Sequence, residues 1–161
     1  MALFDMFKKK AAAAPSQEAI NTGGKLTKED FTVYGVRYHK DSLKKLGVAN
    51  EDWKKSAKAI IAEEKVMQKI YHYSYINKPV KIVPDTEGIY DKNALMVLIA
   101  GEHVGYISDG DTAHVKAILS QTSVKYITAS IRGGEYKVVS LNGDSVKEED
   151  SIKISVRIAY A

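Results

Sequence analysis

An aromatic side chain and a carboxylate stand side by side at Tyr90 and Asp91, just before an apolar run that starts at Ala94. A tyrosine ring offers a flat π surface on which a nucleobase can stack, at roughly 1 to 3 kcal/mol per base. A carboxylate accepts a hydrogen bond from a hydroxyl group, but it repels a phosphate at the same point through like charge. The pair therefore has the chemistry to distinguish a free hydroxyl from a phosphate. The alternative for Asp91 is a turn cap, because Asp beside Asn93 commonly hydrogen-bonds to local backbone N–H groups.

A second set of suitable side chains occurs at Arg37 and Tyr38. A guanidinium can bind a phosphate through two parallel hydrogen bonds, and the neighbouring ring provides another stacking surface. The alternative for Tyr38 is packing in the core. The chain has 24 Lys and Arg against 20 Asp and Glu, and this net charge of +4 mildly favours a polyanionic partner.

Patterns that indicate catalysis are weak. Asp85, Glu135 and Lys137 follow the order of the residues that hold a divalent metal in one nuclease class, but their spacing is much too long. The 4 histidines lack metal-ligand spacing, and the sequence contains no glycine-rich phosphate loop with a lysine. We therefore expect no enzymatic activity, no catalytic residue, no metal site and no cofactor.

Several strands and helices are expected to position these residues. The apolar run from Ala94 to Ile99, a turn at Gly101 and a β-branched return arm predict a hairpin with Tyr90 and Asp91 at its entrance. Other strands are expected at 31–38, 80–84, 124–132, 135–141 and 152–160, with a hairpin turn at Gly133–Gly134. Helices are expected at 41–46, 50–71 and 114–120.

One ordered pattern is more specific than any of these single motifs. It consists of Tyr90-Asp91-x-Asn93-Ala94-Leu95-x-Val97, Gly101, Val104-Gly105-Tyr106-Ile107 and Ala113, with Val33-x-Gly35-x-x-Tyr38 upstream. This pattern resembles the signature of HIRAN domains, small DNA-end-binding modules found alone or fused to helicase-like translocases. The resemblance covers residues 31–139 and is to the stand-alone, bacterial or phage type. The chain departs from the family at Gly88-Ile89, where Asn-Pro is usual, at Asp109, where a cation is usual, and in the long segment after Tyr38.

The resemblance implies a function and a set of contact residues. The residues expected to bind nucleic acid are Arg37, Tyr38, His39, Tyr90, Asp91, Asn93 and Tyr106. It implies that the domain binds single-stranded DNA at free 3′-hydroxyl ends, in DNA repair, replication or phage DNA metabolism. It also implies that the domain has no catalytic activity of its own.

The expected fold is a mixed β protein with helices. We expect an antiparallel OB- or SH3-like β-barrel of about six strands with two covering α-helices. Residues 1–29 are expected to form a flexible N-terminal tail and linker. Residues 30–140 would form the HIRAN-like domain, with a helical insertion at 41–72, and residues 141–161 a C-terminal strand extension packed on it.

A second functional class is a protein-interaction module. In this alternative the barrel has lost end binding and docks to a translocase, nuclease or assembly partner through its N-terminal tail, and the changes at Gly88-Ile89 and Asp109 favour it. The chain has no cysteine and no apolar run long enough to span a bilayer. We therefore expect a cytoplasmic protein whose partners are single-stranded DNA or DNA 3′ ends and, in addition, a helicase or nuclease.

Overall fold

The computed structural model describes residues 25–86 and 93–161. Its main element is an antiparallel sheet of seven strands in the order β3-β8-β9-β1-β7-β6-β5. These strands are β1 (Thr27–Tyr34), β3 (Ile70–Tyr71), β5 (Val80–Pro84), β6 (Leu95–Ile99), β7 (Glu102–Ile107), β8 (Val124–Val139) and β9 (Ser145–Tyr160). A second sheet pairs β2 (Val48–Ala49) with β4 (Tyr73–Ser74). The helices of this described part are α3 (Lys40–Leu46), α4 (Ala57–Ala62) and α5 (Asp109–Gln121), with 3-10 helices η1 (Val36–His39) and η2 (Glu51–Lys54).

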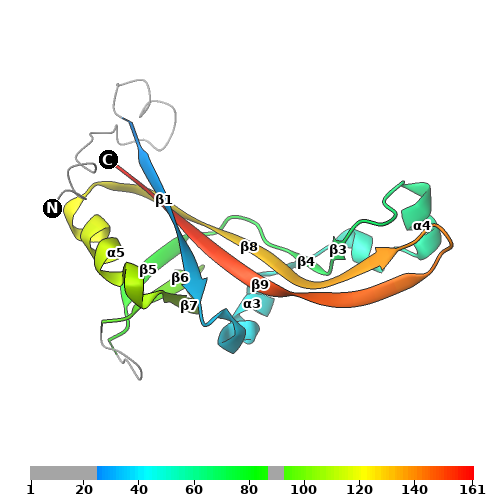
Figure 1. Cartoon of the computed structure of the whole chain (residues 1–161), viewed down its shortest axis with the longest axis horizontal. Helices are drawn as coiled ribbons and strands as arrows, with labels where there is room; N and C mark the ends of the chain where they lie inside the picture. Colours follow the sequence, from blue (N-terminus) through cyan, green and yellow to red (C-terminus); the bar gives the residue numbers. More distant parts are fainter. Residues whose placement is uncertain (1–24, 87–92) are drawn as a thin grey trace.

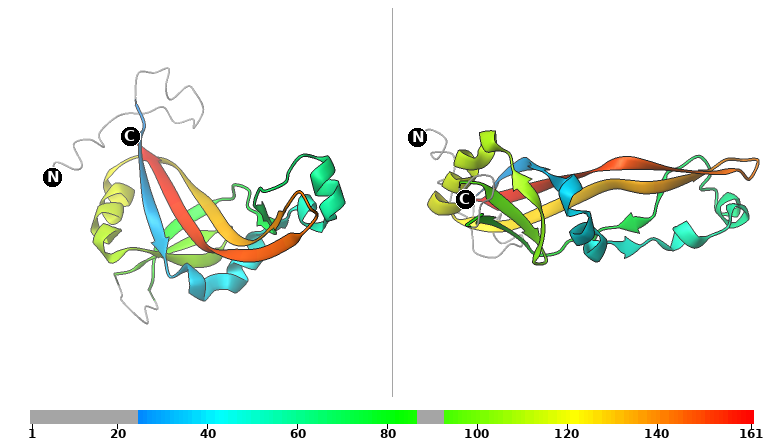
Figure 2. Two further views of the ribbon diagram at one scale, coloured as in Figure 1. Left: turned by 45° about the vertical axis from the view of Figure 1, so that its right-hand side comes forward. Right: turned by 90° about the horizontal axis from the view of Figure 1, so that it is seen from below.

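The molecule consists of a head and a long arm (Figure 1). We define the arm as residues 47–75 and 132–153, and the head as the other described residues. The strands β8 and β9 continue from the head into the arm, where they form a long hairpin. The segment 47–75 follows this hairpin in each view of Figure 2, and it pairs with β8 at Ile70 and Tyr71.

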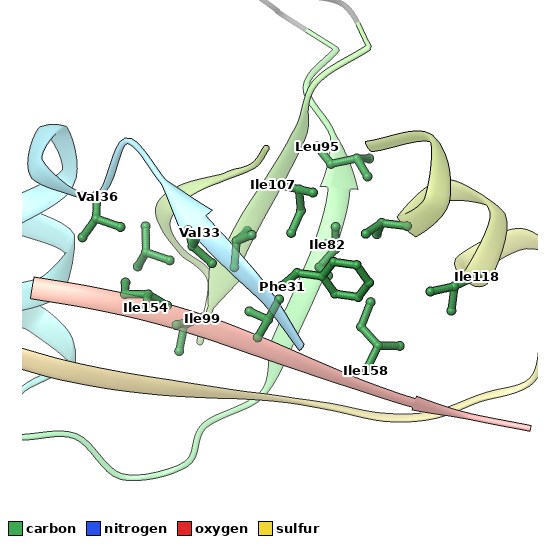
Figure 3. Close-up of a cluster of buried hydrophobic side chains, with 14 of the residues drawn as sticks. Phe31, Val33, Val36, Ile82, Leu95, Ile99, Ile107, Ile118, Ile154 and Ile158 are labelled. Carbon is green, nitrogen blue, oxygen red and sulfur yellow. The ribbon is translucent and has the colours of Figure 1, made fainter. Parts of the chain in front are cut away.

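The core of the head lies on the strand faces for which alternation predicts apolar side chains. In β1, Phe31 and Val33 are buried while Thr32 and Tyr34 are exposed. The strands β9, β6 and β7 contribute Ile154, Val156, Ile158, Leu95, Val97, Ile99, Val104 and Ile107. The helices α3 and α5 cover opposite ends of this cluster. Figure 3 shows Val36 beside the helical segment that follows β1, and Ile118 on α5.

The expectation of an antiparallel β protein with helices is confirmed at this level. The main sheet has seven strands, not about six, and the described residues contain three α-helices, not two. Within the head, β5 forms one edge of the sheet and β8 forms the other, and residues of these two strands come close to each other. Across the described residues, however, no pairing between them closes the sheet into a barrel.

The prediction of one helix over 50–71 is wrong. Asn50 caps a helix as expected, since its side chain accepts a hydrogen bond from the backbone N–H of Asp52, but this helix is the short η2. The backbone is extended at Lys55 and Ser56, so α4 begins as a separate helix with Ser56 as its N-cap. The chain then leaves helical geometry at Glu64, where φ is +59°. The apolar periodicity therefore belongs to several short elements packed along the hairpin.

Contacts from β8 explain why the helix stops. Lys137 is buried, and its Nζ donates hydrogen bonds to the carbonyl oxygens of Trp53 and Lys55 at 2.7 and 2.9 Å. In a continuous α-helix these carbonyls would accept from N–H groups four residues further along the chain. The Trp53 ring stacks on His72, and His72 stacks on Tyr73, with centroid distances of 4.4 and 4.2 Å. These contacts hold η2 and β4 on the arm.

The predicted turn at Gly133–Gly134 is also wrong, because both glycines lie within β8, which continues past them to Val139. The pairing of β8 with β9 shifts register between Arg132 and Gly134, which marks a bulge. A Cβ atom at Gly133 would lie 2.2 Å from the carbonyl oxygen of Ser151, so this glycine permits a close approach of two strands. The actual turn follows Ser140 and includes Gly143, whose φ is +92°.

Replacement of Gly105 by alanine tests the packing of β7 on β1. A Cβ atom at Gly105 would lie 2.5 Å from the carbonyl oxygen of Tyr34 and 2.6 Å from Val33 Cγ1. We expect Gly105→Ala to lower the free energy of unfolding in urea by roughly 1 to 3 kcal/mol through overpacking. The matched control is Gly110→Ala in α5, where the nearest atom would be 4.0 Å away and no loss is expected. Equal unfolding midpoints for the two variants would contradict this account.

Candidate nucleic-acid interface

The chain changes direction where β1 meets the candidate site. Gly35 has a left-handed backbone with φ +77°, and it turns the chain from β1 into η1. The predicted strand therefore ends at Tyr34, and Arg37 and Tyr38 lie on a 3-10 helix. In a strand that continued to Tyr38, alternation would put Val36 on the same face as the exposed Tyr34, but after this turn Val36 is buried in the core.

Arg37 and Tyr38 form a pair on the surface of η1. The Arg37 Nη2 donates a hydrogen bond to the Tyr38 hydroxyl at 2.7 Å, and the guanidinium carbon lies 4.8 Å from the centre of the ring. Tyr38 is 71% exposed, which excludes the alternative that it packs in the core. An accessible ring next to a cation is the arrangement that can stack a base and hold a phosphate.

Three rings from η1 and β7 meet at His39, the residue that follows this pair on η1. The His39 ring lies 4.1 Å from His103 and 6.3 Å from Tyr106, measured between centroids. The rings of His103 and Tyr106 meet edge to face at 4.8 Å. The ring nitrogen Nε2 of His103 hydrogen-bonds to the carbonyl oxygen of Gly105 at 3.1 Å, which fixes the orientation of this ring. We call His39, His103 and Tyr106 the ring cluster.

Asp85 connects the ring cluster to the ends of β5 and β6. Its carboxylate is buried and accepts a hydrogen bond from the Tyr106 hydroxyl at 3.1 Å. Its backbone N–H donates to the carbonyl oxygen of Ala94 at 2.9 Å. The chain thus leaves β5 and enters β6 at one point next to Tyr106. The connection between these strands carries Tyr90 and Asp91 in the sequence.

Tyr90 and Asp91 themselves lie outside the described residues, so the two side chains that opened the sequence argument have no observed position. Asn93, the next predicted contact residue, is exposed and immediately precedes Ala94 and β6. The structure therefore brings together Arg37 and Tyr38 on η1, and His39 with Tyr106 in the ring cluster. It places Asn93 at the start of the strand that pairs with β7.

Sequence reasoning did not place His103 or Asp85 at this site. The pairing of β6 with β7 contains a register shift, so Met96 lies opposite Tyr106 while Leu98 lies opposite His103. Residues three apart in β7 therefore share one face, whereas regular alternation places them on opposite faces. The pair Val104-Gly105 is the only local signal of this bulge, since a glycine within a strand often marks one.

The residues that suggested a metal-dependent nuclease are separated. Asp85 belongs to the head, whereas Glu135 and Lys137 lie on the arm. The Glu135 carboxylate is 2.9 Å from Nδ1 of His72, and Lys137 donates to two backbone carbonyls. Within residues 25–86 and 93–161, no group of three His, Cys, Asp or Glu side chains is arranged to hold a metal ion.

The charges next to Arg37 are of both signs. A pocket of about 260 Å³ lies between η1, α3 and β9, with Arg37 and Lys40 on one side and Glu149 and Asp150 on the other. The Asp150 carboxylate already has partners within the protein. It forms a salt bridge with Lys69 at 2.9 Å and accepts a hydrogen bond from a tyrosine hydroxyl. The positive side of this pocket is continuous with the exposed Arg37–Tyr38 pair.

Comparison of the chain with protein-family models, curated proteins and solved structures found no match. None of the helices in the described parts of the chain has the length and hydropathy needed to cross a membrane.

We expect His39 to make the stability of the head depend on pH. Burial, and then the neighbouring His103, lower the pKa of His39 below its usual 6.5. Between the lowered pKa of His39 in the folded protein and its usual value of 6.5, the unfolded chain binds more protons at His39 than the folded protein does. The stability therefore falls as the pH drops below 6.5. We expect urea unfolding midpoints at about pH 7.5 and about pH 5.5 to differ less in His39→Gln than in the native protein. The same difference in both proteins would show that His39 does not contribute.

Proposed function

We propose that this protein is a HIRAN-like module that binds single-stranded DNA, with preference for a free 3′-hydroxyl end. The observation that carries the proposal is that the exposed Arg37–Tyr38 pair directly precedes His39 on η1, and that His39 belongs to the ring cluster beside the strand ends that flank Tyr90 and Asp91. The finer description of the fold, an OB- or SH3-like β-barrel, belongs to the same proposal and is supported by the approach of β5 to β8.

Stacking and phosphate contacts would supply most of the affinity. Tyr38 is exposed enough to receive a base, and each stacked base contributes roughly 1 to 3 kcal/mol. The Arg37 guanidinium lies over the same ring, so a base stacked on Tyr38 would place its phosphate within reach of this cation. His39 adds a ring N–H donor at the side of the ring cluster, whereas the N–H of His103 is used by the Gly105 carbonyl.

Asp91 would distinguish the end of the strand. A carboxylate accepts a hydrogen bond from a 3′-hydroxyl, and this charge-assisted bond is worth about 1.5 to 3 kcal/mol. A 3′-phosphate at the same point would be repelled. The role of Asp91 is inferred from the HIRAN resemblance, and its support in the structure is that both flanking strands meet beside Tyr106.

We propose a binding module and not an enzyme. The buried carboxylate of Asp85 is engaged by the Tyr106 hydroxyl, and the amine of Lys137 is engaged by two carbonyls. These contacts favour recognition over bond cleavage.

Strands that differ only in the terminal group test end recognition. Binding of a short single strand with a 3′-hydroxyl is compared with that of the same strand with a 3′-phosphate, for native protein and Asp91→Asn. We expect native protein to prefer the hydroxyl by roughly tenfold or more, and the variant to lose most of this preference, because asparagine does not repel the phosphate.

A matched variant separates end recognition from general binding. Tyr90→Ala should weaken both strands alike, since stacking does not depend on the end group. Equal native affinity for the two strands would make Asp91 a turn cap and remove end selectivity from the proposal.

The salt dependence tests the role of Arg37. With two or three phosphates contacted, the slope of log affinity against log salt for a short strand should be roughly −2, at about −0.7 per phosphate. Arg37→Gln should bring this slope closer to zero by about 0.7. The exposed Lys58 on α4 provides the control, and Lys58→Gln should leave the slope unchanged. A flat dependence in native protein would argue against a nucleic-acid ligand.

A protein-interaction module is the second candidate, and one observation on the arm favours it. Three apolar side chains near the tip of the arm are exposed: Met67 at 67%, Leu141 at 75% and Val146 at 54%. Exposed apolar groups that gather at a protruding tip are typical of contact surfaces for other proteins. This candidate becomes the stronger one if neither strand binds in the end-group experiment.

A further inference from the structure

The ring cluster continues onto the outer face of the sheet through Tyr34. Tyr34 lies directly opposite Tyr106 in the pairing of β1 with β7. Residues paired across neighbouring strands share a face, so Tyr34 is on the side of the ring cluster. Val33, the preceding residue, is buried on the other face, whereas Tyr34 is 54% exposed.

Two cations extend the same row across the next two strands. Val33 pairs with Ile154, so the register of β1 with β9 places the preceding residue, Lys153, opposite Tyr34. Lys153 pairs in turn with Arg132 on β8. Both cations are exposed. Because neighbouring strands are about 4.8 Å apart, the row spans about 14 Å from β7 to β8. Figure 2 shows β1, β9 and β8 side by side along this part of the molecule.

The adjoining rows set the limits of this surface. The next row consists of small hydroxyl side chains, with Thr32 paired to Ser155 and Ser155 paired to Ser130, and these leave the large side chains of the first row accessible. In the row after that, Arg157 is neutralised by Asp30 through hydrogen bonds of 2.7 and 2.9 Å. Among these three rows, the accessible positive charge is therefore concentrated in the first.

We propose that a single DNA strand whose end lies at the ring cluster continues across the sheet, with a base on Tyr34 and phosphates at Lys153 and Arg132. This inference rests on the proposed function and adds the path of the strand. An exposed ring followed by two cations complements a polyanion with flat bases, and the row is continuous with the candidate site. Related single-strand-binding folds cover roughly 4 to 16 nucleotides, a footprint larger than one terminal nucleotide.

Strands of two lengths test the path. Affinity is measured for 3′-hydroxyl strands of about four and about twelve nucleotides. Both lengths lie within the range of site sizes of single-strand-binding folds. We expect native protein to bind the longer strand more tightly. The double variant Arg132→Ala/Lys153→Ala should lose this advantage, binding the longer strand roughly tenfold more weakly, with a salt slope reduced by about 1.4 for two lost phosphate contacts. Its affinity for the shorter strand should not change.

Matched variants control for charge and folding. Lys54→Ala/Lys58→Ala also removes two exposed cations, but from η2 and α4 and not from this row of the sheet, and should bind both strands as native protein does. Tyr34→Phe keeps the ring and should retain the affinity for the longer strand, whereas Tyr34→Ala should reduce it. Circular dichroism establishes that each variant is folded before its binding is compared.

The outcomes separate the path from the end site. If native protein binds both lengths equally, or if the double variant binds the longer strand as native protein does, the path is wrong while end recognition stands. If the longer strand depends on Lys153 and Arg132 but shows no preference between a hydroxyl and a phosphate end, the path stands and end recognition is wrong. If neither length binds, both are overturned.

Discussion

Head, arm and candidate site all depend on the pairing of β9 with its two neighbours. β9 is hydrogen-bonded to β8 along its length, and its last residues, from Ile154 to Tyr160, also pair with β1. Without β8 and β1, the buried backbone of this part of β9 would have no hydrogen-bond partners on either side. Apolar and polar side chains alternate along this part of β9, so a shift of one residue would turn its core face to solvent. The same register decides which side chains flank Tyr34.

Local patterns predicted the elements whose turns and periods lie within one short stretch. The hairpin from Ala94 to Ile107, the helix that stops at Gly47 and the alternating final strand were all predicted from neighbouring residues, and each occurs. The patterns failed where distant contacts decide. The Gly133–Gly134 pair has the composition of a turn, and only the nearby Ser151 carbonyl on β9 makes it a bulge. In the same way, the helix expected over 50–71 is interrupted by Lys137, which is distant in sequence. Its amine takes up backbone carbonyls that a continuous helix would use.

For the candidate site, residue type identified Arg37 and Tyr38, but their neighbours depend on strand register. Alternation alone separates His103 from Tyr106, and the register shift in β7 brings them onto one face. Asp85 drew attention as a metal ligand, whereas in the structure it accepts a hydrogen bond from Tyr106. Side-chain chemistry thus identified candidate contacts, and long-range pairing determined which of them act together.

The arm has an apolar cluster of its own, formed by Ile60, Ile70 and Val139 and separate from the cluster of the head. A cluster of this size removes little apolar surface from water, so it adds much less to stability than the core of the head. We therefore expect the segment 47–75 to open locally at a lower free energy than the whole chain. Proteases would meet this segment first, while β1, β7 and the paired ends of β8 and β9 remain folded.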